Sequence, residues 1–164
     1  MSRGPATTPN HPMRRWTQGD DVVEQPQLEK ITNSLIELYD IQGPPVPIES
    51  MLQRPLDEMW EELDISKLSS SFINVSDFYA PRMSLARLLA RHIAGSDWGK
   101  ERGLDVVGRD EEKVRAFARM LMMPSSLVTA LSASARTPEW LSIHFEVPAD
   151  DALLRLQELG LLKR

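Results

Sequence analysis

Histidine, cysteine and acidic side chains are the groups with which a protein binds a catalytic metal or transfers a proton. The 164 residues include three histidines, at positions 11, 92 and 144, and no cysteine. A catalytic zinc site takes three protein ligands and keeps a fourth position open. Such a site would have to be assembled here from scattered residues. One alternative is a hydrolase with non-standard ligands built on Glu111, Asp105 or His92.

The segment Arg82–His92, R-M-S-L-A-R-L-L-A-R-H, resembles the active-site helix R-F-T-L-A-H-E-L-G-H of the ImmA/IrrE family of bacterial zinc metallopeptidases. The resemblance aligns the two zinc-binding histidines of that family with Arg87 and Arg91, and its general-base glutamate with Leu88. Arginine has no lone pair for a metal, and leucine cannot accept a proton. The resemblance therefore implies a degenerate member without metal, cofactor or catalytic residue. Taken as an amphipathic helix alone, the segment would present both arginines to solvent.

The resemblance covers most of the chain after about residue 28. Further matching segments follow in the family's order: Gly43–Glu49, Ile73–Asn74, Asp110–Pro124 and Leu141–Leu162. They imply an α+β, predominantly helical fold, with a small mixed sheet, a zincin-like helical core and a C-terminal helical bundle. The alternating apolar residues of Ser71–Phe78 predict a strand of that sheet. The expected organisation is a disordered tail over residues 1–24 and one domain over residues 25–164.

Glu111 is the residue that the resemblance aligns with the glutamate completing the zinc site, and Lys113 is the competing alignment. We predict that Arg87 and Arg91 form a partly buried ion pair with Glu111 in place of the metal. Removing Glu111 from a buried pair would cost about 3 kcal/mol. The acidic run at 110–112 also suits the start of a helix, where it would cap free N–H groups and favour the helix dipole.

The spacing of apolar residues predicts most of the secondary structure. Helices are expected over residues 26–40, 47–53, 81–94, 110–123, 125–134, 138–145 and 149–159. Residues 95–109 contain four glycines and predict a flexible or sharply turned surface loop. Trp98 in that loop and Asn74 at the predicted strand are candidate contacts for a groove or a partner.

The formal net charge of −5 is unevenly placed. Residues 1–19 hold three arginines and no acidic residue, so the remainder carries 16 basic and 24 acidic groups. The excess of acidic groups after residue 19 argues against a broad surface for binding nucleic acid. No run of 18 apolar residues is present, so we expect no membrane span. The absence of cysteine fits a cytoplasmic protein.

The function implied by the resemblance is that of a pseudo-peptidase that binds a protein without cutting it. Active members of the family inactivate helix-turn-helix repressors, so a repressor is one expected partner, and a larger complex that includes this chain is another. An alternative is a DNA-binding helix-turn-helix over residues 141–161. Its second helix would face DNA with three acidic residues against Arg155 alone, which is the wrong charge for contact with phosphate.

Overall fold

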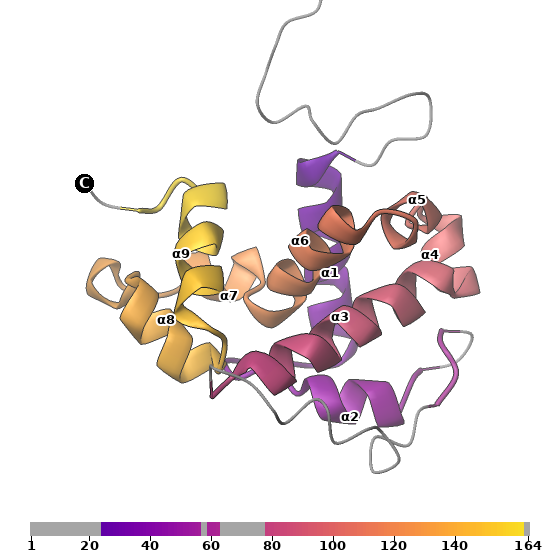
Figure 1. The fold of residues 1–164 in the computed structure, drawn as a ribbon, viewed down its shortest axis with the longest axis horizontal. Coiled ribbons are helices and arrows are strands. Elements are labelled where there is room, and N and C mark those ends of the chain that lie inside the picture. The colour runs from indigo at the N-terminus through magenta and orange to yellow at the C-terminus, as the bar shows by residue number, and fades with distance from the viewer. Residues whose placement is uncertain (1–23, 57–58, 63–77, 163–164) are drawn as a thin grey trace, which may run out of the picture.

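The computed structural model describes residues 24–56, 59–62 and 78–162, and these residues form helices joined by short connections (Figure 1). The elements are α1 (Gln25–Leu38), α2 (Ile48–Gln53), α3 (Ala80–Gly95), α4 (Asp97–Glu101), α5 (Asp105–Gly108), α6 (Glu111–Met122), α7 (Ser125–Thr129), the 3-10 helix η4 (Ala133–Ala135), α8 (Pro138–Phe145) and α9 (Ala149–Glu158). No helix among them is both long and apolar enough to cross a bilayer.

The predicted α+β fold with a small mixed sheet is wrong, because the described part of the chain contains helices and no strand. A sheet needs at least two strands, and the sequence offered one alternating segment, Ser71–Phe78. That segment lies outside the described residues except for Phe78, which stands in a turn ahead of α3. Asn74 also lies outside them.

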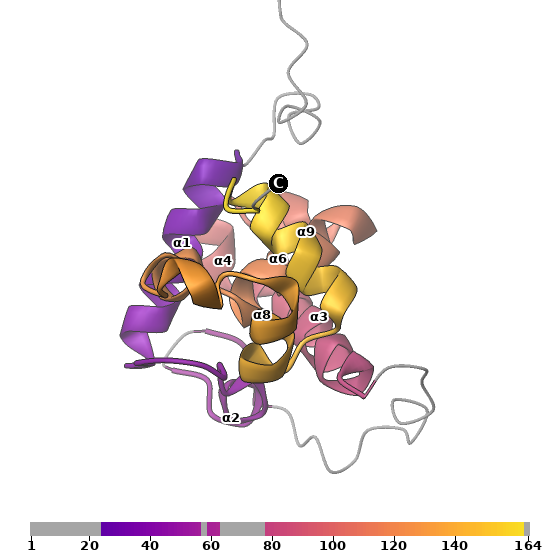
Figure 2. The same cartoon turned by 90° about the vertical axis from the view of Figure 1, so that its left-hand side faces the viewer.

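Helix α6 lies in the middle of the molecule and contacts α1, α3 and α9 (Figures 1 and 2). Its apolar residues recur every three or four positions, so that they share one face that packs into the core. The fully buried Phe117 and Leu121 of α6 belong to the same apolar cluster as Leu89 and Ile93 of α3. Alanines on the buried face of α3, such as Ala90, let the two helices approach closely.

Residues 95–109 form helices α4 and α5, so the structure differs from the predicted loop. Ser96 caps α4 by accepting a hydrogen bond from the Gly99 N–H at 3.0 Å. A Cβ atom on Gly99 would lie 2.0 Å from the carbonyl oxygen of Ile93. Trp98 is half-buried, and the guanidinium of Arg102 lies 4.0 Å from its ring centroid. Gly99 therefore serves close packing at this junction, and Trp98 already has an intramolecular partner.

The other predicted helices are present with small shifts at their ends. The exception is the predicted helix 125–134, which stops after α7 at Thr129 and continues only as η4. The helix start inferred from the acidic run at 110–112 is confirmed, and Thr137 caps a second helix in the same way. Asp110 accepts from the Glu112 N–H at 2.9 Å, and Thr137 accepts from the Trp140 N–H at 3.1 Å.

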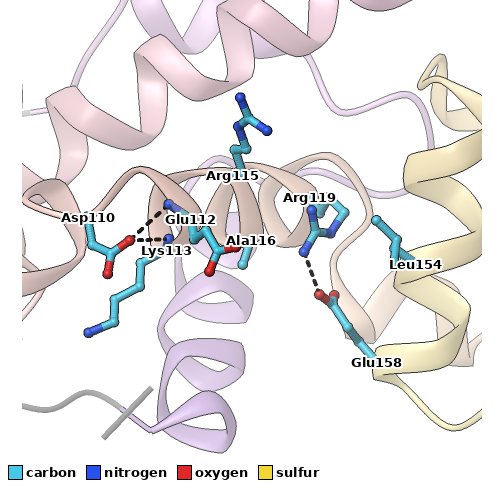
Figure 3. Close-up of a pocket in the computed structure, with 8 residues that line it drawn as sticks. All are labelled: Asp110, Glu112, Lys113, Arg115, Ala116, Arg119, Leu154 and Glu158. Carbon is cyan, nitrogen blue, oxygen red and sulfur yellow. Dashed lines mark hydrogen bonds and ion pairs between the residues drawn. The ribbon is translucent and has the colours of Figure 1, made fainter. Parts of the chain in front are cut away.

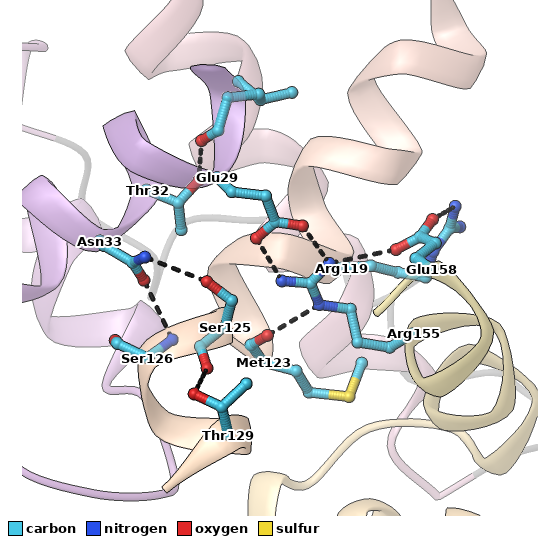
Figure 4. A network of polar contacts seen from close by, with 11 residues as sticks. Glu29, Thr32, Asn33, Arg119, Met123, Ser125, Ser126, Thr129, Arg155 and Glu158 are labelled. Atoms are coloured by element: carbon cyan, nitrogen blue, oxygen red, sulfur yellow. Dashed lines mark hydrogen bonds and ion pairs between the residues drawn. The ribbon is translucent and has the colours of Figure 1, made fainter. Parts of the chain in front are cut away.

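A buried guanidinium ties the first helix to the last (Figure 4). Arg155 of α9 has no exposed surface, and its Nη1 and Nη2 atoms each donate to one carboxylate oxygen of Glu29 on α1 at 2.6 Å. Its Nε donates to the carbonyl oxygen of Met123 at 2.8 Å. One side chain thus fixes α9 to α1 and to the end of α6.

Candidate functional site

The residues aligned with a peptidase active site lie on two neighbouring helices. Arg87, Leu88 and Arg91 are on α3, and Glu111 is the first residue of α6. The two helices run in opposite directions, so the end of α3 lies beside the beginning of α6 (Figure 1). This arrangement brings Arg91 and Glu111 together although they are 20 positions apart in the sequence.

Arg91 and Glu111 form an ion pair across the two helices. The Arg91 Nη2 donates to the Glu111 Oε1 at 2.5 Å, and the Arg115 Nε lies 3.9 Å from the other carboxylate oxygen. The side chains of Arg91 and Glu111 are 44% and 53% exposed. The expectation of a partly buried pair is therefore wrong, and the cost of about 3 kcal/mol does not apply. An exposed pair of this kind contributes less than about 1 kcal/mol.

Arg87 does not take part in that pair. Its Nη2 donates to the Ser84 Oγ at 3.0 Å, one turn earlier on the same helix. Within the described ranges, no carboxylate oxygen lies in ion-pair distance of Arg87. Burial, followed by repulsion from Arg115, lowers the pKa of Arg87, while the charges of Glu111 and Asp151 act in the opposite direction. Arg87 is consequently a half-buried cation whose charge is only partly compensated.

Sequence reasoning missed the continuation of this cluster along α6. Arg115 and Arg119 follow Glu111 at intervals of four, so all three lie along one side of the helix. Arg119 donates from Nη2 to the Glu158 carboxylate at 2.8 Å, and its Nη1 lies 3.9 Å from the Asp151 carboxylate. Burial raises the pKa of Asp151, and the nearby Arg119 opposes that shift. We call these residues the arginine cluster: Arg87, Arg91, Arg115, Arg119, Glu111, Asp151 and Glu158.

Two hollows lie beside the cluster. One, of about 310 Å³, lies between α6 and α9 (Figure 3). Its lining residues are Asp110, Glu112, Lys113, Arg115, Ala116, Arg119, Leu154 and Glu158. The other, of about 560 Å³, is more open and follows α3, where Leu88, Arg91 and His92 line it together with Trp60. Two of the three aligned α3 positions therefore face a concave surface, whereas Trp98 lines neither hollow.

The described residues contain no group of three or more His, Cys, Asp or Glu side chains placed to share a metal ion. Of the residues considered for a non-standard hydrolase, His92 lies near the end of α3, and Asp105 is exposed at the start of α5. In the part of the chain that the structure covers, no hydrogen bond or ion pair joins either of them to Glu111.

Helices α8 and α9 have the layout of a helix-turn-helix, because three residues connect them and the first, Glu146, is left-handed with φ of 61°. The outward side of α9 presents Asp150, Leu153 and Gln157. The one basic residue of α9, Arg155, is buried against Glu29 and is not available to a phosphate. The charge of this surface therefore opposes DNA binding.

No family model, curated protein or solved structure matches this chain.

The ion pair predicts how Glu111 responds to pH. The hydrogen bond from Arg91 is the main cause that lowers the pKa of Glu111. Because the folded-state pKa lies below the unfolded one, the pair's contribution to stability is complete above the unfolded-state pKa. That contribution is lost as the pH falls through the folded-state pKa. Carbon-detected NMR titration should place the midpoint of Glu111 below the usual range for a glutamate.

The matched test of this prediction uses two arginine variants. In Arg91→Gln, the pKa of Glu111 should rise toward the usual range, because the hydrogen-bonded cation is gone. In Arg54→Gln, which removes the same charge from an exposed position after α2, the titration of Glu111 should stay as in the wild type. An unchanged midpoint in Arg91→Gln would contradict the ion pair.

Proposed function

We propose that this protein is a non-catalytic, peptidase-like module that binds another protein. The observation that carries the proposal is the 2.5 Å contact between Arg91 and Glu111 across α3 and α6. The ImmA/IrrE resemblance aligns these two residues with the second histidine and the glutamate of a zinc site. An ion pair joins them without a metal across two helices that pack through their buried apolar residues.

A protein partner is favoured over nucleic acid by the charges around the cluster. The outward side of α9 carries Asp150 and offers no basic side chain, and Asp110 and Glu112 line the hollow between α6 and α9. A chain with a net charge of −5 and acidic groups beside its candidate site would repel a continuous phosphate backbone. Under this proposal the partner is a helix-turn-helix repressor or another subunit of a complex, and the module acts in the cytoplasm.

Reinstalling the zinc ligands tests whether α3 and α6 have the peptidase arrangement. We expect the wild-type protein to retain less than about 0.1 equivalent of zinc after dialysis, because arginine provides no metal ligand. The triple variant Arg87→His, Leu88→Glu and Arg91→His should retain about one equivalent, since two histidines four apart would then face Glu111. Mass spectrometry of the metal content measures both, and circular dichroism checks that the variant folds.

The control adds Glu111→Ala to the triple variant, which should then lose its zinc on dialysis. A folded triple variant that holds no zinc would show that the two helices are not arranged as in a peptidase. One equivalent held by the wild-type protein would instead favour a hydrolase with non-standard ligands. Salt-dependent binding of the wild-type protein to duplex DNA would favour the helix-turn-helix alternative.

A further inference from the structure

The arginine cluster at the contact of α3, α6 and α9 combines four guanidinium groups with three carboxylates. Glu111 accepts a hydrogen bond from Arg91 at 2.5 Å and lies 3.9 Å from the Arg115 Nε. Among the described residues, Arg87 contacts neither carboxylate oxygen of Glu111, and it donates to the Ser84 hydroxyl. Arg119, the fourth cation of the cluster, pairs with Glu158 and lies 3.9 Å from Asp151, whose charge also acts on Arg87 and Arg115. The cluster therefore carries one positive charge in excess, and among the described residues Arg87 is the cluster arginine without a carboxylate oxygen in ion-pair distance.

The half-buried position of Arg87 makes this excess costly. Burial disfavours the charged guanidinium, and repulsion from Arg115 adds to the effect, so both lower the pKa of Arg87. A carboxylate placed between the two arginines would relieve both effects at once. Guanidinium groups also provide planar pairs of donors that match the two oxygens of a carboxylate.

The surroundings of Arg115 indicate what would accompany that carboxylate. Arg115 also lines the hollow of about 310 Å³ between α6 and α9, and so do the apolar side chains of Ala116 and Leu154 (Figure 3). Leu154 is 42% exposed, so it is open to contact from outside. Asp110 and Glu112 on the same hollow would repel a polyanion, which favours a single carboxylate followed by an apolar side chain.

From this geometry we infer that Arg87 and Arg115 bind an acidic side chain of a partner protein, and that an apolar residue next to it enters the hollow at Leu154. The inference rests on the proposed function, because it names the chemistry of the protein segment that the module binds. Arg91 and Glu111 keep their own pair and fix the position of Arg115 from the other side.

Binding of a defined peptide tests the inference. The probe is a fluorescein-labelled hexapeptide amide with one glutamate, Ser-Ser-Glu-Leu-Ser-Ser, and its affinity is measured by fluorescence anisotropy at low salt. We expect wild-type protein to bind it, and Arg87→Gln or Arg115→Gln to weaken the affinity roughly tenfold each, the usual effect of losing one charged hydrogen bond. Arg54→Gln, with the same change of charge elsewhere, should stay within about twofold of the wild type.

Further arms identify the group that is bound. The peptide Ser-Ser-Gln-Leu-Ser-Ser should not bind, and Leu154→Ser should weaken binding of the acidic peptide without changing binding of acetate. In NMR spectra, the side-chain Nε signal of Arg87 should shift on addition of the acidic peptide. No binding of that peptide to wild-type protein, equal binding by Arg87→Gln, or tighter binding of a single-stranded oligonucleotide would each overturn the inference.

The two proposals fail separately. If the triple variant holds zinc but the wild-type protein does not bind the acidic peptide, the peptide site is overturned. The proposed peptidase-like arrangement of α3 and α6 then still stands. Peptide binding that depends on Arg87, together with a folded triple variant that holds no zinc, would overturn the peptidase-like arrangement and leave the peptide site.

Discussion

Replacing Arg155 with methionine is expected to lower the free energy of unfolding by about 3 to 5 kcal/mol. The substitution leaves the carboxylate of Glu29, whose side chain is only 15% exposed, without its two donors at 2.6 Å. It also leaves the Met123 carbonyl without the Nε donor at 2.8 Å. Most of the loss comes from the unpaired charge, because methionine itself fills much of the space of the arginine stem. Urea unfolding followed by circular dichroism measures the change.

Two further variants separate the lost pair from lost packing. The double variant Glu29→Met and Arg155→Met removes both charges, so it should be markedly more stable than Arg155→Met alone. Arg54→Met, at an exposed arginine, should change stability by less than about 0.5 kcal/mol. A loss below about 1 kcal/mol for Arg155→Met would mean that the remaining carboxylate is hydrated as well as it is in water.

Gly99→Ala is expected to cost about 2 to 3 kcal/mol. The added Cβ would lie 2.0 Å from the Ile93 carbonyl oxygen and 3.0 Å from its carbonyl carbon, which are backbone atoms. No rotamer change relieves such a contact, so the junction of α3 and α4 has to move. Since Ile93 is fully buried, the movement would propagate into the core. Thermal unfolding of the wild type and the variant measures the cost.

Gly95→Ala is the matched control for that prediction. Gly95 ends α3 only four residues earlier, and a Cβ atom there would meet nothing within 4 Å. Alanine has a better helix propensity than glycine, so this variant should be slightly more stable than the wild type, by about 0.5 kcal/mol. Equal effects of the two substitutions would contradict the close packing at Gly99.

The long helices were predictable because each one buries a regular apolar face. Leu28, Ile31 and Leu35 of α1 are examples, and all three are buried. The residues at helix ends were equally informative, since capping depends on local backbone geometry. Gly160, for example, has φ of 69° and follows the end of α9, a position that glycine favours.

Features that depend on distant neighbours were not predictable from the sequence. Glycines permit flexibility and close packing alike, and only the position of Ile93 shows that Gly99 serves the second purpose. The contact of Arg91 with Glu111 was expected, but its exposure depends on what covers the two helices, which the spacing does not reveal. The DNA-binding alternative placed Arg155 on the outward side of α9. It lies instead beside the buried Ala152 and Leu156, where Glu29 from α1 makes its burial tolerable.

The link between Glu29 and Arg155 also constrains when this protein is able to fold during its synthesis. The two residues are 126 positions apart, so α1 leaves the ribosome long before its counter-ion exists. At roughly 10 residues per second, the delay is on the order of 10 s. For that time the carboxylate of α1 remains in water, and the apolar face of α1 stays exposed until α6 and α9 have been synthesised. Closure of the chain around Arg155 is therefore a late step, and α1 is the segment that a chaperone would meet while the rest of the chain is being made.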